Sequence, residues 1–491
     1  MYQKYLINKK IIILNFVYKK MIYLKTMKVS QTFYFLIFLF LKINCFEVPP
    51  QLKQVCPQGC KRYFYCDEVQ KKCVYKGFFP IYRLEFLEIV VLMTSSSLAT
   101  SCGIGGGTVY SSMILGVEEF EPSEAFPIAN FLILLCGLIT FTSFAMDKYE
   151  HPKNIFVHYD IAVVFGPAML LGAKFGTILN RILSSTILLI FLLCLLIYTT
   201  SKTYKNILKA KKRELLLKKQ EGNELNQPLL DQDQNNEENN RNAELNSEER
   251  ERLEFIKEEE DPLNWPSITF ILFMELLVII DQFIEGSNKV PSFVWIQRCS
   301  FWYWVSFGVY VFITLIFVKL AISYILKKVR RKKELLPEYN SEVMENVENH
   351  ISYIVSIGIF AGIVSSSLGI GGGMITNPVF SGLGMDPKQS SSTSNFLIIV
   401  TAIASSFIFV LSGQLNIVYS LNMGALCTVA AWIGSFFILK YINRTGKSSI
   451  LLVIMEYFLI ASFFIALYKL ITNDTQGYGF IGHIFMLNKY C

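Results

Sequence analysis

Long apolar stretches alternate with short polar segments along most of the 491-residue chain. About ten of these stretches reach the length of roughly 20 residues that a helix needs to cross a bilayer. Two of them, within residues 84–115 and 351–380, are interrupted by clusters of glycine. The pattern therefore predicts an all-α polytopic membrane protein with about 8–10 transmembrane helices. The uninterrupted spans are expected at residues 124–146, 155–178, 182–201, 266–284, 300–326, 391–411, 417–440 and 448–471.

The two interrupted segments begin two halves that share short strings in the same order. The matching strings are Gly-Ile-Gly-Gly-Gly at 103–107 and 369–373, Asn-Phe-Leu-Ile at 130–133 and 395–398, and a glycine with a later Asn-Arg pair at Gly172 and 180–181 and at Gly434 and 443–444. Broken membrane helices at corresponding places in two halves are typical of a transporter with its site at the repeat interface.

The basic residues orient the predicted spans. Lys and Arg concentrate at 202–219 and at 327–333, and both blocks are expected in the cytoplasm. Two expected spans separate the blocks, so both lie on one side of the membrane. With residues 46–80 outside the cytoplasm, that side is the cytoplasmic one only if the first glycine-broken segment enters the membrane and returns. The second half then starts from the opposite side, so we expect two inverted repeats with re-entrant, glycine-broken segments. With 52% apolar and 17% charged residues, the net charge of +7 indicates membrane orientation and not nucleic-acid binding.

The start of the chain differs from the membrane repeats. Residues 1–45 have the profile of a signal peptide or N-terminal anchor, and Met27 is an alternative start of translation. Residues 46–80 form a small polar module with Cys56, Cys60, Cys66 and Cys73, which we expect outside the cytoplasm as two disulfides. Zinc and free thiols are the alternatives, but the spacing lacks the paired Cys-x-x-Cys form of zinc sites.

The remaining boundaries follow from changes in composition. They give a first membrane repeat at 83–201, a disordered charged cytoplasmic loop at 202–264, two connecting transmembrane helices at 265–327, a basic cytoplasmic linker at 328–350, a second repeat at 351–472 and a C-terminal tail at 473–491.

Glycine breaks in a membrane helix suggest a binding site, because they free backbone N–H and C=O groups that lipid cannot satisfy. Hydroxyl and amide side chains nearby would supply hydrogen bonds to an anion. The expected substrate-binding residues are Gly103, Gly105, Gly106, Gly107, Thr108, Asn130, Gly369, Gly371, Gly372, Gly373, Thr393, Ser394 and Asn395. Close helix packing is the alternative for the glycines, and capping or interhelical bonding is the alternative for the asparagines.

Three ionisable residues fall inside predicted spans. Glu275 and Glu456 are candidates for carrying a coupling proton, and Lys174 either contacts the anion or pairs with another charge. The spans show no metal-ligand spacing, no cofactor motif and no nucleophile–base arrangement, so the sequence does not indicate an enzyme.

At the glycine motifs the chain resembles the TauE/SafE family of sulfite exporter-like membrane permeases. The resemblance rests on residues 103–108, on Gly-Ile-Gly-Gly-Gly-Met-Ile-Thr-Asn-Pro at 369–378, and on 393–395, and it covers about residues 83–472. It implies transport of small sulfur-containing or organic anions, such as sulfite or sulfonates. In the first half Ser112 stands where the second half has the proline.

The expected function is that of a secondary transporter working by alternating access. Its partners would be a small anionic substrate, a coupling proton and the lipid bilayer, with no nucleic acid and no cofactor. We expect a multi-pass protein of the plasma membrane or an endomembrane of a eukaryotic cell. A membrane receptor or scaffold whose cysteine-rich module binds a partner, and an anion channel, are the alternatives.

Overall fold

In the computed structural model the chain forms two compact units. The described residues are 63–67, 72–101, 105–150, 157–224, 264–287, 291–297, 300–335, 345, 347–348, 350–385, 387–445 and 449–473.

The smaller unit contains a β-hairpin. Strand β1 (Phe64–Asp67) pairs antiparallel with β2 (Lys72–Tyr75), and the register sets Cys66 opposite Cys73. The side chains of these two cysteines, and all of Cys56 and Cys60, lie outside the described residues. The two disulfides therefore stay a prediction, as do the signal peptide and the start at Met27.

The larger unit, here called the membrane body, is built of helices, which confirms the predicted fold class. Among the described residues, eight helices are long and apolar enough to cross a membrane. These are α4 (Pro122–Glu150), α5 (Tyr159–Ile182), α6 (Ser185–Glu224), α8 (Trp265–Glu285), α9 (Phe301–Leu335), α11 (Ile351–Leu368), α13 (Pro387–Ser412) and α14 (Ile417–Thr445). The others are α2 (Arg83–Ser101), α3 (Gly107–Gly116), α12 (Gly373–Gly382) and α15 (Ser449–Asn473).

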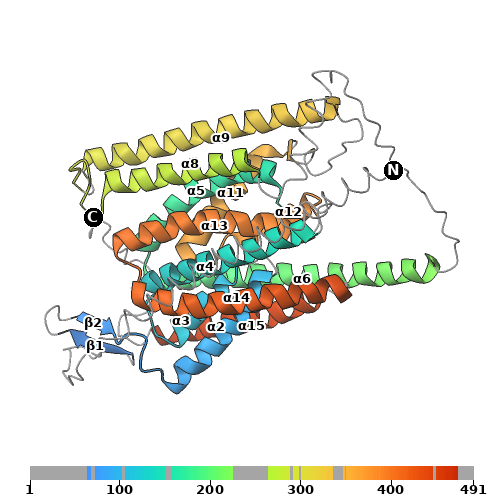
Figure 1. Cartoon of the computed structure of the whole chain (residues 1–491). Helices are drawn as coiled ribbons and strands as arrows, with labels where there is room; N and C mark the ends of the chain where they lie inside the picture. The colour runs from blue at the N-terminus through green and yellow to red at the C-terminus, as the bar shows by residue number, and fades with distance from the viewer. Residues whose placement is uncertain are drawn as a thin grey trace, which may run out of the picture. The chain divides into compact units, whose positions relative to one another are not determined.

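The first helix of each broken segment packs against the other repeat. Helix α11 of the second repeat packs along α5 of the first, and α2 of the first packs along α14 of the second. Helices α4 and α13 pack on each other between these pairs (Figure 1). The α5–α11 and α2–α14 pairs both approach closely at a glycine. A Cβ on Gly172 would overlap the Ile359 carbonyl of α11, and one on Gly434 would overlap Ser97 of α2.

The spans of the two repeats run in opposite directions. Lys328 near the end of α9 pairs with Asp160 at the start of α5, and the amide of His158 donates to Thr393 near the start of α13. Helices α5 and α13 therefore start at one end of the membrane body, the Lys328 end. Arg181 at the end of α5 donates to Gln414, which follows α13. This opposite end is called the Gln414 end (left in Figure 1).

Both broken segments return to the end from which they start. Glu88 near the start of α2 interacts with Glu118, just after α3, so the first segment enters and leaves on one side. Helix α11 runs parallel to α5, from Gly358 beside Ala168 to Ser367 bonded to Asn180. It therefore starts at the Lys328 end, where α12 leads directly into α13. The segments are re-entrant and the repeats are inverted, as the basic residues predicted.

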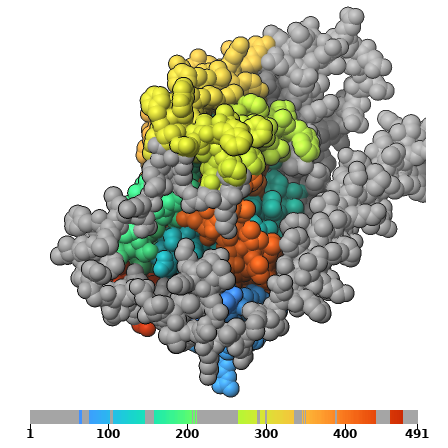
Figure 2. Space-filling view, turned by 90° about the vertical axis from the view of Figure 1, so that its left-hand side faces the viewer, coloured from blue at the N-terminus to red at the C-terminus, as the bar shows by residue number. Residues whose placement is uncertain are grey.

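Helices α8 and α9 lie outside the repeats. They pack on each other and on α5, and α8 also contacts α13. Figures 1 and 2 both place them together on one flank of the membrane body. Helix α6 continues to Glu224 and α9 to Leu335, so both basic blocks lie on helices that extend past the apolar spans. Helix α6 continues past residue 202 because Lys, Leu and Glu after it are strong helix formers, and the domain boundary expected there stays a prediction.

Candidate functional site

The two glycine turns have backbone conformations that other residues seldom adopt. In the first, Gly105 and Gly106 have φ of 83° and 66°. In the second, Gly369 and Gly371 have φ of 60° and 70°. A residue with a Cβ is sterically strained in this left-handed region of backbone conformation. Glycine is therefore favoured at these four positions of the turns. The expected Gly103 lies outside the described residues.

Short helices restart directly after the turns. Gly106 precedes α3 and Gly372 precedes α12, and neither helix start has a side-chain cap. Gly107 and Gly373 are the first residues of these helices. The first N–H groups of a helix have no carbonyl partner within it and form the positive end of its dipole. Each repeat therefore brings one such positive helix start into the membrane body.

The turns of the two repeats touch each other. A Cβ on Gly107 would overlap the backbone of Ile370 in the second turn. A Cβ on Gly105 or on Gly371 would lie in van der Waals contact with both Ile133 and Ile398, which occupy corresponding places in the two repeats. Each turn is thus packed against one isoleucine from its own repeat and one from the other. The repeat interface passes through the glycine turns.

A hydroxyl from the first repeat fixes this contact. Ser111 of α3 donates to the carbonyl oxygens of Leu368 and Gly369, at 3.1 and 3.0 Å. These carbonyls end α11, where the helix leaves backbone acceptors without intrahelical partners. Ser111 therefore stabilises the second turn from the opposite repeat.

The two repeated asparagines also reach across the interface. The amide nitrogen of Asn130 donates to the carbonyl oxygen of Ser366 on α11, at 3.4 Å, and that of Asn395 donates to the carbonyl oxygen of Gly137 on α4, at 3.1 Å. Both side chains are fully buried, at 0% and 1% exposed. The interhelical-bonding alternative is therefore correct for their amide nitrogens. Their side-chain carbonyl oxygens, in contrast, are not hydrogen-bonded to any described residue.

Four buried oxygens around the turns have no hydrogen-bond partner among the described residues. They are Asn130 Oδ1, Asn395 Oδ1, Thr108 Oγ1 and Ser366 Oγ. A buried polar atom without a partner is destabilising, typically by about 1–3 kcal/mol. Such atoms gathered at a repeat interface indicate a place where a polar ligand or water completes the hydrogen bonds.

Two of the expected site residues are engaged elsewhere. Thr393 Oγ1 accepts a hydrogen bond from the amide of His158 at the Lys328 end, 3.0 Å away. Ser394 Oγ lies 3.1 Å from Thr376 Oγ1 of α12, which donates to it. Thr393 therefore connects α13 to the segment before α5 of the first repeat, and Ser394 connects it to α12 of its own repeat, whereas Asn395 reaches α4 of the first repeat.

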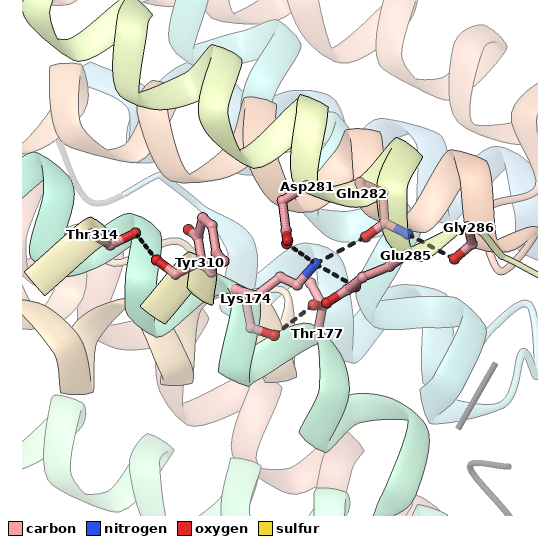
Figure 3. A network of polar contacts seen from close by, with 8 residues as sticks. All are labelled: Lys174, Thr177, Asp281, Gln282, Glu285, Gly286, Tyr310 and Thr314. Atoms are coloured by element: carbon pink, nitrogen blue, oxygen red, sulfur yellow. Dashed lines mark hydrogen bonds and ion pairs between the residues drawn. The ribbon is translucent and has the colours of Figure 1, made fainter. Parts of the chain in front are cut away.

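The ionisable residues of the spans lie in different surroundings. Lys174 pairs with Asp281 and Glu285 of α8, at 2.7 and 2.6 Å (Figure 3). The pairing alternative is thus correct, and Lys174 is not near the glycine turns. Glu275 is 4% exposed on α8, whereas Glu456 on α15 is only half-buried. Among the described residues, no group of His, Cys, Asp and Glu has an arrangement suited to a metal ion.

Sequence reasoning missed Ser111, Ser366 and the isoleucine pair. Ser111 and Ser366 sit in serine-containing strings beside the glycines, Ser-Ser at 111–112 and Ser-Ser-Ser at 365–367. Proximity in sequence to both turns was the available signal. Ile133 and Ile398 belong to the repeated Asn-Phe-Leu-Ile string, whose last residue carries no polar chemistry.

Comparison with known proteins gives one consistent result. A family model described as Sulfite exporter TauE/SafE matches residues 70–203 and 300–463, more than half of the chain. Sulfite exporter TauE/SafE family protein 3 of Arabidopsis thaliana is 23% identical over 369 residues, covering 72% of this chain and 71% of the relative. Family protein 1 of the same plant is 24% identical over 376 residues, covering 74% of this chain and 78% of the relative. No solved structure matches the chain.

Proposed function

Because the chain belongs to the sulfite exporter TauE/SafE family, as a multi-pass membrane transporter, we propose that it carries sulfite or related small sulfur-containing or organic anions by alternating access. The observation that supports this most is the meeting of the two glycine turns at the repeat interface, with one asparagine from each repeat beside them. Inverted-repeat transporters place the substrate where their repeats meet.

The chemistry around the turns suits a small oxyanion. Thr108 and Ser366 carry hydroxyl groups whose oxygens have no partner among the described residues, so each can donate to a substrate oxygen. Rotation of an asparagine side chain exchanges its oxygen and its NH₂ group, so Asn130 and Asn395 can also present donors. The starts of α3 and α12 add backbone N–H groups and a positive dipole end.

The arrangement is closed to both ends of the membrane body. Thr108, Asn130, Asn395 and both isoleucines are at most 1% exposed. A substrate therefore enters only if the repeats move relative to each other. Because the turns contact each other across the repeat interface, such a movement opens the site directly. This supports rocking of one repeat against the other as the transport step.

The test is uptake of isotope-labelled sulfite into proteoliposomes containing the full chain. Wild-type uptake is expected to saturate and to be competed by unlabelled sulfonates. Asn130→Ala and Asn395→Ala are each expected to lower the initial rate by about tenfold or more, the equivalent of about 1.4 kcal/mol. Ser405→Ala is the matched control, because this buried hydroxyl on α13 bonds only to Thr401 of its own helix among the described residues.

Three outcomes would contradict parts of the proposal. Absence of saturable uptake of sulfite or a competitor by well-folded wild-type protein would remove the substrate class. Uptake that rises linearly with concentration would indicate a channel. Wild-type rates in both asparagine variants would be consistent with transport, but would exclude the two asparagines from the substrate-binding site.

A further inference from the structure

Helix α8 has its charged residues on the side that faces protein. Its exposed face is apolar, with Leu272, Phe273, Leu276, Ile280 and Phe283. Its buried residues are Ile271, Met274, Glu275, Val278, Asp281, Gln282 and Glu285. Three carboxylic side chains therefore point into the membrane body. Ionisable residues inside a membrane span are costly and usually serve a function.

One ammonium group lies among two of these carboxylates. The Nζ atom of Lys174 on α5 is 2.7 Å from Asp281 Oδ2, 2.6 Å from Glu285 Oε2 and 3.4 Å from Gln282 Oε1 (Figure 3). The ring of Tyr310 on α9 lies 5.7 Å from the same nitrogen. Lys174 is 2% exposed. All three N–H donors of the Lys174 ammonium group therefore bond to side chains of helix α8.

The described charges around α8 do not balance. Lys174 pairs with Asp281 and Glu285, and Tyr310 interacts with these two groups and with Glu275. Arg181 on α5 also interacts with Glu285. Even with both cations counted, three ionised carboxylates would leave one buried negative charge. Isolated buried charge is so unfavourable that the group takes up a proton instead.

Glu275 is the carboxyl group without compensation. Both of its oxygens are buried and have no hydrogen-bond partner among the described residues. Glu285 Oε1, whose other oxygen binds Lys174, is also buried without a partner there. Asp281 lies between these two on the helix. About 9 Å of helix separates Glu275 from Asp281, and about 6 Å separates Asp281 from Glu285.

The cluster breaks the symmetry of the repeats. Gly172 and Gly434 are matching residues, so Phe436 on α14 is the counterpart of Lys174. Phe436 is 58% exposed and faces away from the body. Helix α8 also lies between the two regions that the family model matches. Lys174 and α8 therefore form a feature that the inverted repeats alone do not require.

We propose that the buried face of α8 is a proton-binding site, in which Glu275 holds the proton and the Asp281–Lys174–Glu285 cluster links it to the Gln414 end. Ser287, two residues beyond Glu285, bonds to Leu411 at that end. Protonation forms an O–H bond on Glu275, and release returns the electron pair to the carboxylate. The proton is the coupling ion of the transporter, a role that rests on the proposed function.

The test of proton binding does not depend on transport. Infrared difference spectra of the purified full chain, recorded between acidic and alkaline buffer, report protonated carboxyl groups through their C=O stretch. Wild type is expected to show a titrating band that Glu275→Gln removes. Glu334→Gln, which removes an exposed carboxylate on α9, is the matched control and is expected to keep the band. An unchanged band in Glu275→Gln overturns the proposal.

Two further variants keep the test decisive if Glu275→Gln fails to fold. Glu275→Asp retains a carboxyl group and is expected to shift the band. Lys174→Met removes the ammonium group that pairs with Asp281 and Glu285, and is expected to add a second carboxyl band. A cluster that only joins α8 to α5 would lose stability in Lys174→Met but show no titrating band in wild type. Stabilisation by sodium ions in place of protons would also overturn the proposal.

Coupling is tested separately in proteoliposomes with labelled sulfite. An imposed pH gradient is expected to raise wild-type uptake several-fold. Glu275→Gln is expected to retain exchange of labelled for unlabelled sulfite while losing this stimulation. If wild type carries no sulfite, the proposed function fails and the infrared result still decides whether α8 binds a proton.

Discussion

Gly107 and Ile370 are in backbone contact across the two repeats. A Cβ on Gly107 would lie 2.5 Å from both the Cα and the carbonyl carbon of Ile370, and would also overlap the Ile133 side chain. The Ile370 atoms are backbone and cannot rotate away as the terminal methyl of Ile133 can. The contact therefore requires glycine at residue 107 although Gly107 is helical, and any larger residue would push the turns apart.

We expect Gly107→Ala to destabilise the protein by about 1–3 kcal/mol, the usual range for overpacking a core. It should also impair sulfite uptake, because the turns would separate. Gly308→Ala is the control: a Cβ at this residue of α9 would meet no atom within 4 Å. That change is expected to be neutral or to stabilise by up to about 1 kcal/mol. Thermal melting in detergent measures both, and equal melting temperatures would contradict the prediction.

Substitution of two adjacent glycines in the second turn should change the stability of the protein by different amounts. Gly371 has φ of 70°, so Gly371→Ala is expected to cost about 1–2 kcal/mol from backbone conformation alone. Gly371→Asn should cost less, since asparagine tolerates this region. Gly372 has φ of −62°, and of the three nearest atoms to a Cβ there, only the terminal methyl of Met169 would overlap it. Gly372→Ala should therefore be mild; melting temperatures in the reverse order would be inconsistent with the turn geometry.

The repeat architecture could be predicted from the sequence because it depends on features that one chain displays. Apolar length, glycine clusters and the position of Lys and Arg together specify spans, breaks and orientation. The recurring Asn130 and Asn395 were expected at the interface for the same reason. Their partners, the carbonyls of Ser366 and Gly137, could not be expected, because every residue offers a backbone carbonyl.

Side-chain partners between distant helices were beyond sequence reasoning. Thr393 and Ser394 precede Asn395, but helical rotation turns them toward His158 and Thr376 instead of toward α4, which Asn395 reaches. Lys174 was ambiguous because its partners are on α8, far along the chain. Periodicity shows that a helix has a charged face without showing which helix covers it.

The ends of the membrane body should face opposite sides of the membrane. Lys333 is the last residue of the second basic block on α9, and Trp295, which is 92% exposed, precedes α9. Because basic segments stay in the cytoplasm, Lys333→Cys should react with a membrane-impermeant maleimide only after the membrane is opened. Trp295→Cys should react in intact cells. Wild type gives the background of native cysteines, and labelling of both variants from one side would exclude this topology.

The ion pair between Lys328 and Asp160 provides a test of how α9 is held to the first repeat. Its atoms are 3.1 Å apart, and the side chains are 9% and 10% exposed. Removing one partner of a buried pair typically costs about 3–5 kcal/mol, because the other charge stays buried. His158 and Lys332 also interact with Asp160, so Lys328→Met is expected at the lower end of this range. The loss should appear as a lower melting temperature.

An exposed pair on the same helix supplies the control for Lys328→Met. Arg331 and Glu334 are 3.2 Å apart, with side chains 41% and 65% exposed, so Arg331→Met should cost at most about 1 kcal/mol. The double change Lys328→Met with Asp160→Asn should recover much of the loss, since it removes the uncompensated charge. If the double variant is as unstable as the sum of its single variants, the two charges are not coupled and α9 is held by its apolar contacts alone.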